Sequence, residues 1–261
     1  MDAENFFFNG KELRDFGYII CEFDGEENTV SVPPVSFTTI KPPGDDRKKF
    51  ISASYDDTIV FEFSITKFDC YGEITDIDAF EDSAMRKWLC REDGFHPFMF
   101  YQDGFEEIYY NAQINLTPKF INGKIRGYRL IVTTDNAYGY SELLEKEFDL
   151  SPTLPYQFLS MSDRAGYIYP MWEFTAKQNG DLCIKVAEDT NQTNTIFHNM
   201  KSGDTIILDS DRCILEGIDV NNFNWIMPRI VQGYEETQNT ITSTIPCHVK
   251  IKYKLARKAV G

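Results

Sequence analysis

Apolar and polar residues alternate along much of the chain, which is the pattern of β-strands buried on one face only. The stretch 58–65 shows it most clearly, because every second residue is a large apolar one: Ile59, Phe61, Phe63 and Ile65. Residues 108–114 and 127–133 repeat the pattern. We therefore predict a mainly β protein.

Two Asn-Gly dipeptides separate such runs. Asn-Gly is favoured in two-residue hairpin turns because both residues tolerate a positive φ. Asn9-Gly10 follows the aromatic run Phe6–Phe8, and Asn122-Gly123 lies between the second and third predicted strands. We predict a β-hairpin at each dipeptide.

One segment has helical spacing instead, over about residues 76–91. Asp76 and Asp78 supply acids for the first turn, and Arg86 and Lys87 supply bases for the last. The predicted core-facing stripe has three- and four-residue spacing: Ile77, Phe80, Ala84 and Trp88. This reading explains the acids at 76–82 better than a calcium site does, because the glycine and ligand spacing of an EF-hand are missing.

Residues 28–52 fit neither pattern. Pro33-Pro34 and Pro42-Pro43 keep the segment out of the centre of a sheet, and residues 45–49 are all charged. Apolar residues still occur at short intervals: Val30, Val32, Val35, Phe37 and Ile40. We expect an extended arm that leaves its domain, and a surface loop folded back on the domain is the alternative.

A domain boundary is predicted at Leu150–Pro155, where two prolines interrupt the pattern, giving domains 1–150 and 156–261. The second domain has short predicted strands and no helical segment: 168–174, 182–186, 204–209, 214–215 and 247–255. Such spacing is typical of a β-sandwich or jelly roll.

The charge of the chain restricts its partners. The 261 residues contain 41 acids and 26 bases, a formal net charge of −15. Clustered bases are needed to grip DNA or anionic lipid, so we expect neither, although an acidic wall would let DNA slide past. No apolar run reaches about 18 residues, so no membrane span is expected. No leader-like segment precedes Phe6, so we expect folding in the cytoplasm of the producing cell.

Candidate chemistry is sparse. The three histidines are scattered, and the six cysteines form no C-x-x-C pair, which argues against zinc and redox motifs. We expect no enzyme, metal or cofactor. Trp172 and Trp225 are the residues that a sugar-binding surface would use, although packing in the core or an interface is the commoner role of tryptophan.

Several features together resemble the distal tail protein (Dit) family of long-tailed, non-contractile phages. They are the Phe-Asn-Gly hairpin followed by Asp15-Phe16-Gly17, the proline-punctuated arm, the helix that ends in Trp88-Leu89, and the run from Gly127 to Tyr140. The likeness covers nearly the whole chain and is one of order and pattern. It implies an N-terminal, β-sandwich-like, ring-forming domain with one helix and an arm, followed by a C-terminal galectin-like β-sandwich.

The resemblance also implies a structural role. Members form a hexameric ring at the tail tip that joins the tail tube protein to the tail-associated hub or lysin protein, and DNA passes through the lumen without specific binding. We expect either a single hexameric ring or two rings stacked as a dodecamer. The place of action is then the virion tail tip, after assembly in the host cytoplasm. We expect the arm to contact the neighbouring subunit through seven residues: Val30, Val32, Pro33, Pro34, Val35, Phe37 and Ile40.

Two other functions remain open. One is a carbohydrate-binding module for host recognition that uses Trp172 or Trp225. The other is a tail tube protein, which shares the ring but normally lacks a second sandwich. An enzyme is the least favoured class.

Overall fold

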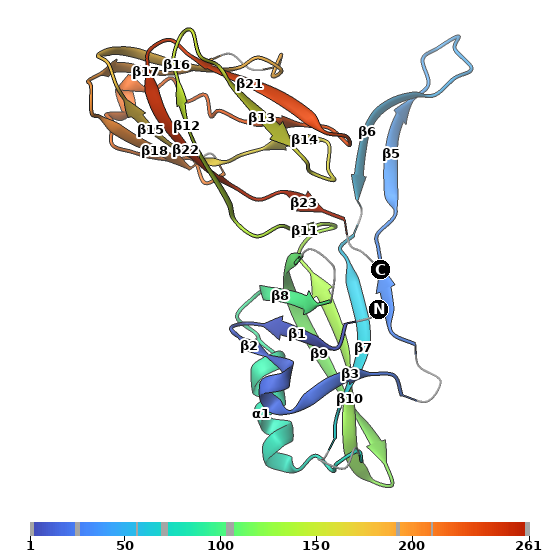
Figure 1. Ribbon diagram of the computed structural model, residues 1–261. Helices are drawn as coiled ribbons and strands as arrows, with labels where there is room; N and C mark the ends of the chain where they lie inside the picture. Colours follow the sequence, from blue (N-terminus) through green and yellow to red (C-terminus); the bar gives the residue numbers. More distant parts are fainter. Residues whose placement is uncertain are drawn as a thin grey trace. The chain divides into compact units, whose positions relative to one another are not determined.

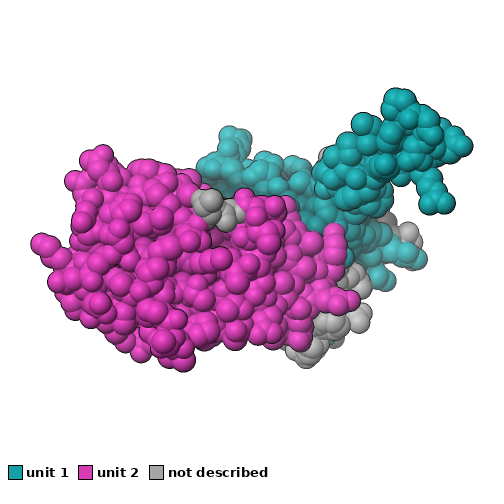
Figure 2. Space-filling model, turned by 90° about the horizontal axis from the view of Figure 1, so that it is seen from above, with its two compact units in different colours: residues 1–140, 258–261 teal, residues 141–257 magenta. Residues whose placement is uncertain are grey.

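The computed structural model describes residues 3–23, 27–55, 57–68, 73–102, 107–191, 194–209 and 211–258. The chain divides into two compact units, Met1–Tyr140 with Lys258–Gly261 and Ser141–Arg257, coloured separately in Figure 2. Strands dominate both units (Figure 1), which confirms the predicted mainly β fold.

Unit 1 contains eleven strands and one α-helix among its described residues. They are β1 (Asn5–Phe8), β2 (Lys11–Glu12), β3 (Tyr18–Cys21), β4 (Thr29–Ser31), β5 (Val35–Ile40), β6 (Lys49–Tyr55), β7 (Val60–Lys67), α1 (Ala79–Leu89), β8 (His96–Tyr101), β9 (Tyr109–Ile121), β10 (Lys124–Thr134) and β11 (Gly139–Tyr140), with a 3-10 turn at Leu13–Phe16.

The main sheet of unit 1 is antiparallel and curls on itself. Its strand order is β2-β1-β8-β9-β10-β7-β3, and β4 also pairs with β7. Although β1 and β7 are not neighbours in this order, the rings of Phe6 and Phe63 lie 5.6 Å apart. The backbone N–H of Ile20 in β3 also donates to the carbonyl of Glu4, next to β1 (3.3 Å). The two ends of the sheet therefore approach each other and enclose a core, as expected of a sandwich-like domain.

Both predicted hairpins are confirmed. Asn9 and Asn122 adopt φ of 46° and 52°, and the glycines that follow them adopt 81° and 77°. The first turn joins β1 to β2, and the second joins β9 to β10. The alternation in β7 is confirmed as well, because Phe61, Phe63 and Ile65 are buried, together with Ile59 just before the strand.

The helix lies within the predicted range, but two residues of its predicted apolar face, Phe80 and Ala84, are exposed, so this part of the prediction is wrong. Asp78 caps it by accepting hydrogen bonds from the N–H groups of Phe80 and Glu81, each at 2.8 Å. The buried residues of the helix are Met85, Trp88 and Leu89. Phe80 is 87% exposed, because the helix is rotated so that Met85, rather than Phe80, faces the sheet.

Unit 2 is built from twelve strands among its described residues. They are β12 (Leu144–Leu150), β13 (Tyr156–Ser160), β14 (Gly166–Ile168), β15 (Met171–Ala176), β16 (Gly180–Val186), β17 (Thr195–Met200), β18 (Thr205–Asp209), β19 (Ile214–Glu216), β20 (Ile230–Gln232), β21 (Thr237–Ser243), β22 (Cys247–Tyr253) and β23 (Ala256–Arg257), with a 3-10 turn at Val220–Asn222.

Two of its sheets enclose the core of unit 2. One has the order β12-β22-β15-β18-β19, and the other has the order β13-β21-β16-β17. A single hydrophobic cluster takes buried side chains from both, such as Trp172 and Val249 from the first and Phe158 and Ile184 from the second. The arrangement is the β-sandwich that the strand spacing predicted.

The division between the units differs from the predicted boundary at Leu150–Pro155. β12, which precedes those prolines, pairs with β22 over its whole length and belongs to unit 2. Ser151–Leu154 form a turn closed by hydrogen bonds between the backbone groups of Ser151 and Leu154. The prolines therefore mark a turn inside the sandwich, and the division falls between Tyr140 and Ser141.

Candidate interaction surface

The expected arm is a β-hairpin made of β5 and β6. Among the described strands these two pair only with each other, and they form a ribbon separate from the main sheet of unit 1 (Figure 1). At its base, the ring of Tyr55 packs edge-on against Tyr138 at 5.1 Å. At its tip, Gly44 adopts φ 82°, and the N–H of Asp45 donates to the carbonyl of Pro42 (3.1 Å), which closes the turn.

The cross-strand register gives the hairpin two different faces, because residues directly opposite each other point to the same side. Val35 pairs with Tyr55, Phe37 with Ala53, and Thr39 with Phe50, which makes one face mostly apolar. The other face carries mainly serine, threonine and lysine: Ser36, Thr38, Lys49, Ser52 and Ser54, with Ile40. The arm is therefore amphipathic, although it covers no core of its own.

The apolar face of the arm lies open to solvent. Phe37 is 66% exposed and Phe50 is 64% exposed, and their rings meet edge to face at 6.1 Å. Large apolar residues that remain exposed together mark interaction surfaces more often than those scattered singly. This face is consequently the strongest candidate for a contact with another chain.

The structure places the seven predicted interface residues differently. Val30 lies in β4 and is partly buried against the core of unit 1, and Pro33 is buried, so these two offer less surface to a neighbour than the other five. The other five are exposed: Val32, Pro34, Val35, Phe37 and Ile40. Sequence reasoning missed Phe50 and Ile51, which are exposed on the second strand of the arm.

The two tryptophans considered for sugar binding lie in different environments. Trp172 is fully buried in the core of unit 2, and its Nε1 donates to the carbonyl of Pro228 (3.1 Å). It offers no face to a sugar, so its assignment to a carbohydrate site is corrected. Trp225 is 53% exposed and adopts φ 58°. The side chain of Asn224 fixes this backbone by accepting from Ile196 N (3.0 Å) and donating to Asn194 O (2.8 Å).

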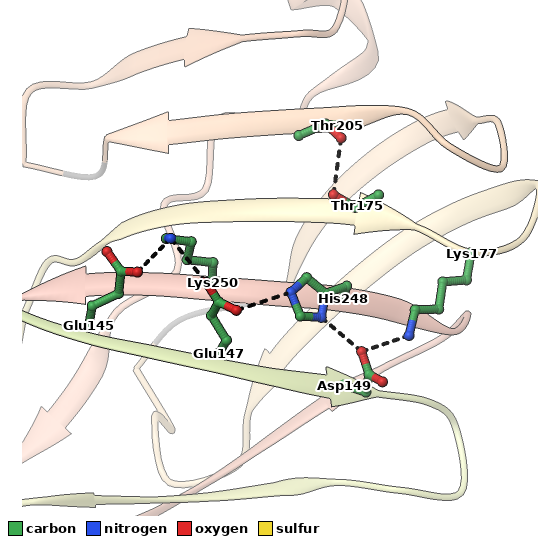
Figure 3. Close-up of polar contacts among 8 residues, drawn as sticks. All are labelled: Glu145, Glu147, Asp149, Thr175, Lys177, Thr205, His248 and Lys250. Carbon is green, nitrogen blue, oxygen red and sulfur yellow. Dashed lines mark hydrogen bonds and ion pairs between the residues drawn. The ribbon is translucent and has the colours of Figure 1, made fainter.

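A network of charges covers the outer face of the β12-β22-β15 sheet (Figure 3). Lys250 Nζ lies 2.5 Å from Glu145 Oε1 and 3.0 Å from Glu147 Oε1. His248 Nδ1 lies 2.9 Å from Asp149 Oδ1, and Lys177 donates to the same oxygen at 2.7 Å. Each acid of β12 therefore faces a base across the strand pair.

The network is a self-paired surface rather than a catalytic group. The bonds from Lys177 and then from His248 lower the pKa of Asp149, and the bond from Lys250 lowers the pKa of Glu145. The other ring nitrogen of His248 faces Glu147 at 3.9 Å, so both nitrogens face carboxylates and neither has a described hydroxyl or thiol partner. A nucleophile and base within reach of each other, as acyl transfer requires, are not assembled here.

The remaining reactive side chains form no further site among the described residues. No group of three or more histidine, cysteine or acidic side chains among them is placed to hold a metal ion. No helix in this part of the chain is long and apolar enough to cross a membrane. The described cysteines are all free, and Cys70 lies outside the described residues.

Comparison with known proteins gives two family matches. A model for the phage tail protein N-terminal domain matches residues 1–136, and a model for the phage tail C-terminal domain matches residues 138–253. No curated protein matches the chain.

Solved structures share the fold. The Dit protein of phage SPP1, described as a paradigm of the hub adsorption apparatus in phages that infect Gram-positive bacteria, matches with a TM-score of 0.65 and 11% identity. The match covers 96% of this chain and 98% of that one. A chain of the phage p2 baseplate in its activated conformation matches 98% of this chain and 99% of its own, with a TM-score of 0.48 and 12% identity.

These findings bear out the resemblance drawn from the sequence. The likeness to the SPP1 protein runs through both units and shows that they share its fold. The N-terminal family model alone covers more than half of the chain, and the C-terminal model continues from it. The chain therefore belongs to the family of phage tail proteins that these two domains define.

Proposed function

We propose that this tail protein is a distal tail protein: a structural, non-enzymatic subunit of a hexameric ring at the virion tail tip, between the tail tube protein and the tail-associated hub or lysin protein. The observation that carries the proposal is the exposed apolar face of the arm, on a chain whose fold matches the SPP1 Dit protein nearly end to end. Assembly of the ring, alone or as two stacked rings, precedes its incorporation into the tail in the host cytoplasm.

The arm supplies the kind of contact that a closed ring needs. In a ring, one patch of each subunit meets a different patch on the next, so a segment that reaches outward suits the geometry. Phe37 and Phe50 are each about two-thirds exposed. With about 200 Å² per phenylalanine and about 25 cal/mol per Å², covering both contributes about 6 kcal/mol before ordering costs. That is enough to make Phe37 and Phe50 the central residues of the contact between subunits.

The charge of the chain suits a passage for DNA. With a net charge of −15, a lumen lined by this protein repels phosphate, and DNA slides without sticking. A ring structure whose lumen is neutral or basic would contradict this part of the proposal.

The experiment that tests the proposal removes the arm without disturbing the sheet. Val35 and Tyr55 are paired, so their neighbours are close enough for a short Gly-Ser linker to replace residues 35–55. The deletion spares β4 and β7. Light scattering and negative-stain images of the intact chain should show six or twelve copies, and the deletion variant should be monomeric. Intact rings from the deletion variant would contradict the proposed role of the arm.

Point substitutions refine the test. Replacing Phe37 and Phe50 by serine should weaken the ring, because it removes the apolar face. Replacing Thr38 and Ser52 by alanine is the matched control, since this pair lies on the opposite face of the same hairpin. Equal effects of the two pairs would show that the apolar face is not the contact.

A carbohydrate-binding role for unit 2 is the second candidate, and the exposed Trp225 favours it. Its ring lies 5.4 Å from that of Phe223 and is about half exposed, and an exposed aromatic side chain is suited to stack on a sugar ring. Binding on a glycan array that Trp225→Ala abolishes would support this function, and an array without binding would contradict it.

A further inference from the structure

The arm differs in charge from the rest of the chain. The hairpin, residues 35–55, contains four bases and two acids, whereas the remaining residues contain 22 bases and 39 acids. The arm is therefore positive by two charges on a chain that is otherwise negative by seventeen.

Two of the four bases are not used within the arm. Lys41 lies 3.6 Å from Asp46, and Lys49 lies 3.6 Å from Asp45, so both acids of the tip have a partner. Arg47 and Lys48 are exposed and have no ion-pair partner among the described residues. They precede Phe50 by three and two residues, near the tip of the hairpin and the outer end of the apolar face.

We infer that Arg47 and Lys48 dock the arm on an acidic surface of a second copy of this chain, so that ring closure is driven partly by opposite charges and weakens as salt rises. The inference rests on the proposed ring. A second copy fits as the occupant because its own charge outside the arm is strongly negative, which is complementary to the tip. The apolar face beside the two bases also requires a partner that covers phenylalanine rings, and a protein surface does this better than a DNA backbone.

DNA is the competing partner for two exposed bases. A protein that neutralises only two phosphates binds DNA weakly, and the acidic body beside the arm repels the polyanion. The inference would be overturned in favour of DNA by two results together. The intact chain would retain DNA and lose it when the two bases are substituted, and the same substitution would leave ring dissociation unchanged.

The first experiment compares ring dissociation in two variants of equal charge. Arg47→Glu/Lys48→Glu reverses the free bases of the tip. Lys201→Glu/Lys254→Glu reverses two exposed bases of unit 2 and is the matched control. By sedimentation at 50 mM NaCl, the tip variant should raise the dissociation constant of the ring at least tenfold, and the control less than threefold. The difference in dissociation constant between the two variants should shrink as NaCl rises to 0.5 M, because salt screens exposed charges.

The outcomes separate this inference from the proposed function. If the intact chain forms no ring, the proposed function fails. If rings form but both variants dissociate equally, or the dissociation constant of the intact ring does not change with salt, only the charged docking fails.

A second measurement locates the contact. Carbodiimide couples an amine to a carboxylate only when the two touch, so it should join Lys48 to an acid of the neighbouring copy. Mixing isotope-labelled and unlabelled chains before coupling makes such a bond visible by mass spectrometry as a mixed cross-link. A Lys48 cross-link found only within one chain would overturn the inference.

Discussion

The ion pair between Asp189 and Arg229 offers the sharpest test of how unit 2 is held together. Arg229 donates from Nε to Asp189 Oδ2 (2.7 Å) and from Nη2 to Oδ1 (3.1 Å). The two side chains are only 5% and 18% exposed. The guanidinium also lies over the ring of Tyr167, 3.7 Å from its centroid. The pair fastens the loop after β16 to the segment before β20.

Asp189→Ala should cost about 3–4 kcal/mol of unfolding free energy. Removing one partner of a buried pair leaves an uncompensated charge, which typically costs about 3–5 kcal/mol. The bond from Asn191 N to Asp189 Oδ1 (3.1 Å) is lost as well. The remaining contact between Arg229 and the Tyr167 ring offsets part of the loss. Adding Arg229→Met should recover most of it, because an apolar side chain of similar length needs no partner.

The assay is urea unfolding followed by tryptophan fluorescence in a Trp88→Phe background. The remaining tryptophans, Trp172 and Trp225, both lie in unit 2, so the signal reports that unit alone. A loss below about 1 kcal/mol for Asp189→Ala would refute the account of this pair. A double variant whose loss equals or exceeds that of Asp189→Ala would refute it as well.

Acidification gives a check on the same residue. The hydrogen bonds from Arg229 lower the pKa of Asp189 in the folded state. Its contribution to stability is therefore fully present above the unfolded pKa of about 3.9 and is lost as the pH falls through the folded value. The stability difference between the wild type and Asp189→Ala should be constant from pH 5 to 7 and shrink below about pH 4. A difference that grows on acidification would contradict this sign.

Three further predictions concern single positions. Phe80→Ser should change the unfolding free energy of unit 1 by less than about 0.5 kcal/mol, measured by thermal or urea unfolding. Trp88→Ala on the same helix should cost about 3–5 kcal/mol. Similar losses for the two variants would contradict the observed buried face of the helix. Gly127→Ala should cost about 1–3 kcal/mol in the same assay, because the added Cβ would lie 2.4 Å from the carbonyl oxygen of Ile65. A variant as stable as the wild type would contradict this close approach of β10 to β7. Lys250→Gln should leave the urea midpoint of unit 2 close to that of the wild type, since its ion pairs are near the surface, and a clearly lowered midpoint would contradict that.

The sequence predicted elements wherever a local rule was decisive. The Asn-Gly dipeptides predicted turns because both residues tolerate a positive φ, and the structure has these φ values. The alternation over β7 predicted a strand with its apolar residues buried, and this is confirmed. The helix was predictable in place because its cap and charged ends are local. The buried face of the helix was not predictable. Phe80 and Met85 both lie at helical spacing from Trp88, and only the packing of the helix on the sheet decides that Met85 is buried.

The candidate site was predictable in part for similar reasons. Phe37 was predictable as an interface residue because it lies in the proline-punctuated segment. Phe50 was not, because it follows a charged run and shares a face with Phe37 only through a register shift in the hairpin. Trp172 could have been assigned to the core from its own strand, where Trp172, Phe174 and Ala176 alternate and all three are buried. The prolines at 152 and 155 suggested a boundary because a turn within a sandwich and a linker have the same composition.

The most direct test of the central claim is the solution mass of the purified chain, measured by light scattering with images of the same peak. One chain has a mass of 30.2 kDa, so a ring of six has about 180 kDa and a stacked pair of rings twice that. The account predicts one of these masses and six-fold rings in the images. A stable dimer, a monomer at every concentration, or open-ended tubes would contradict it.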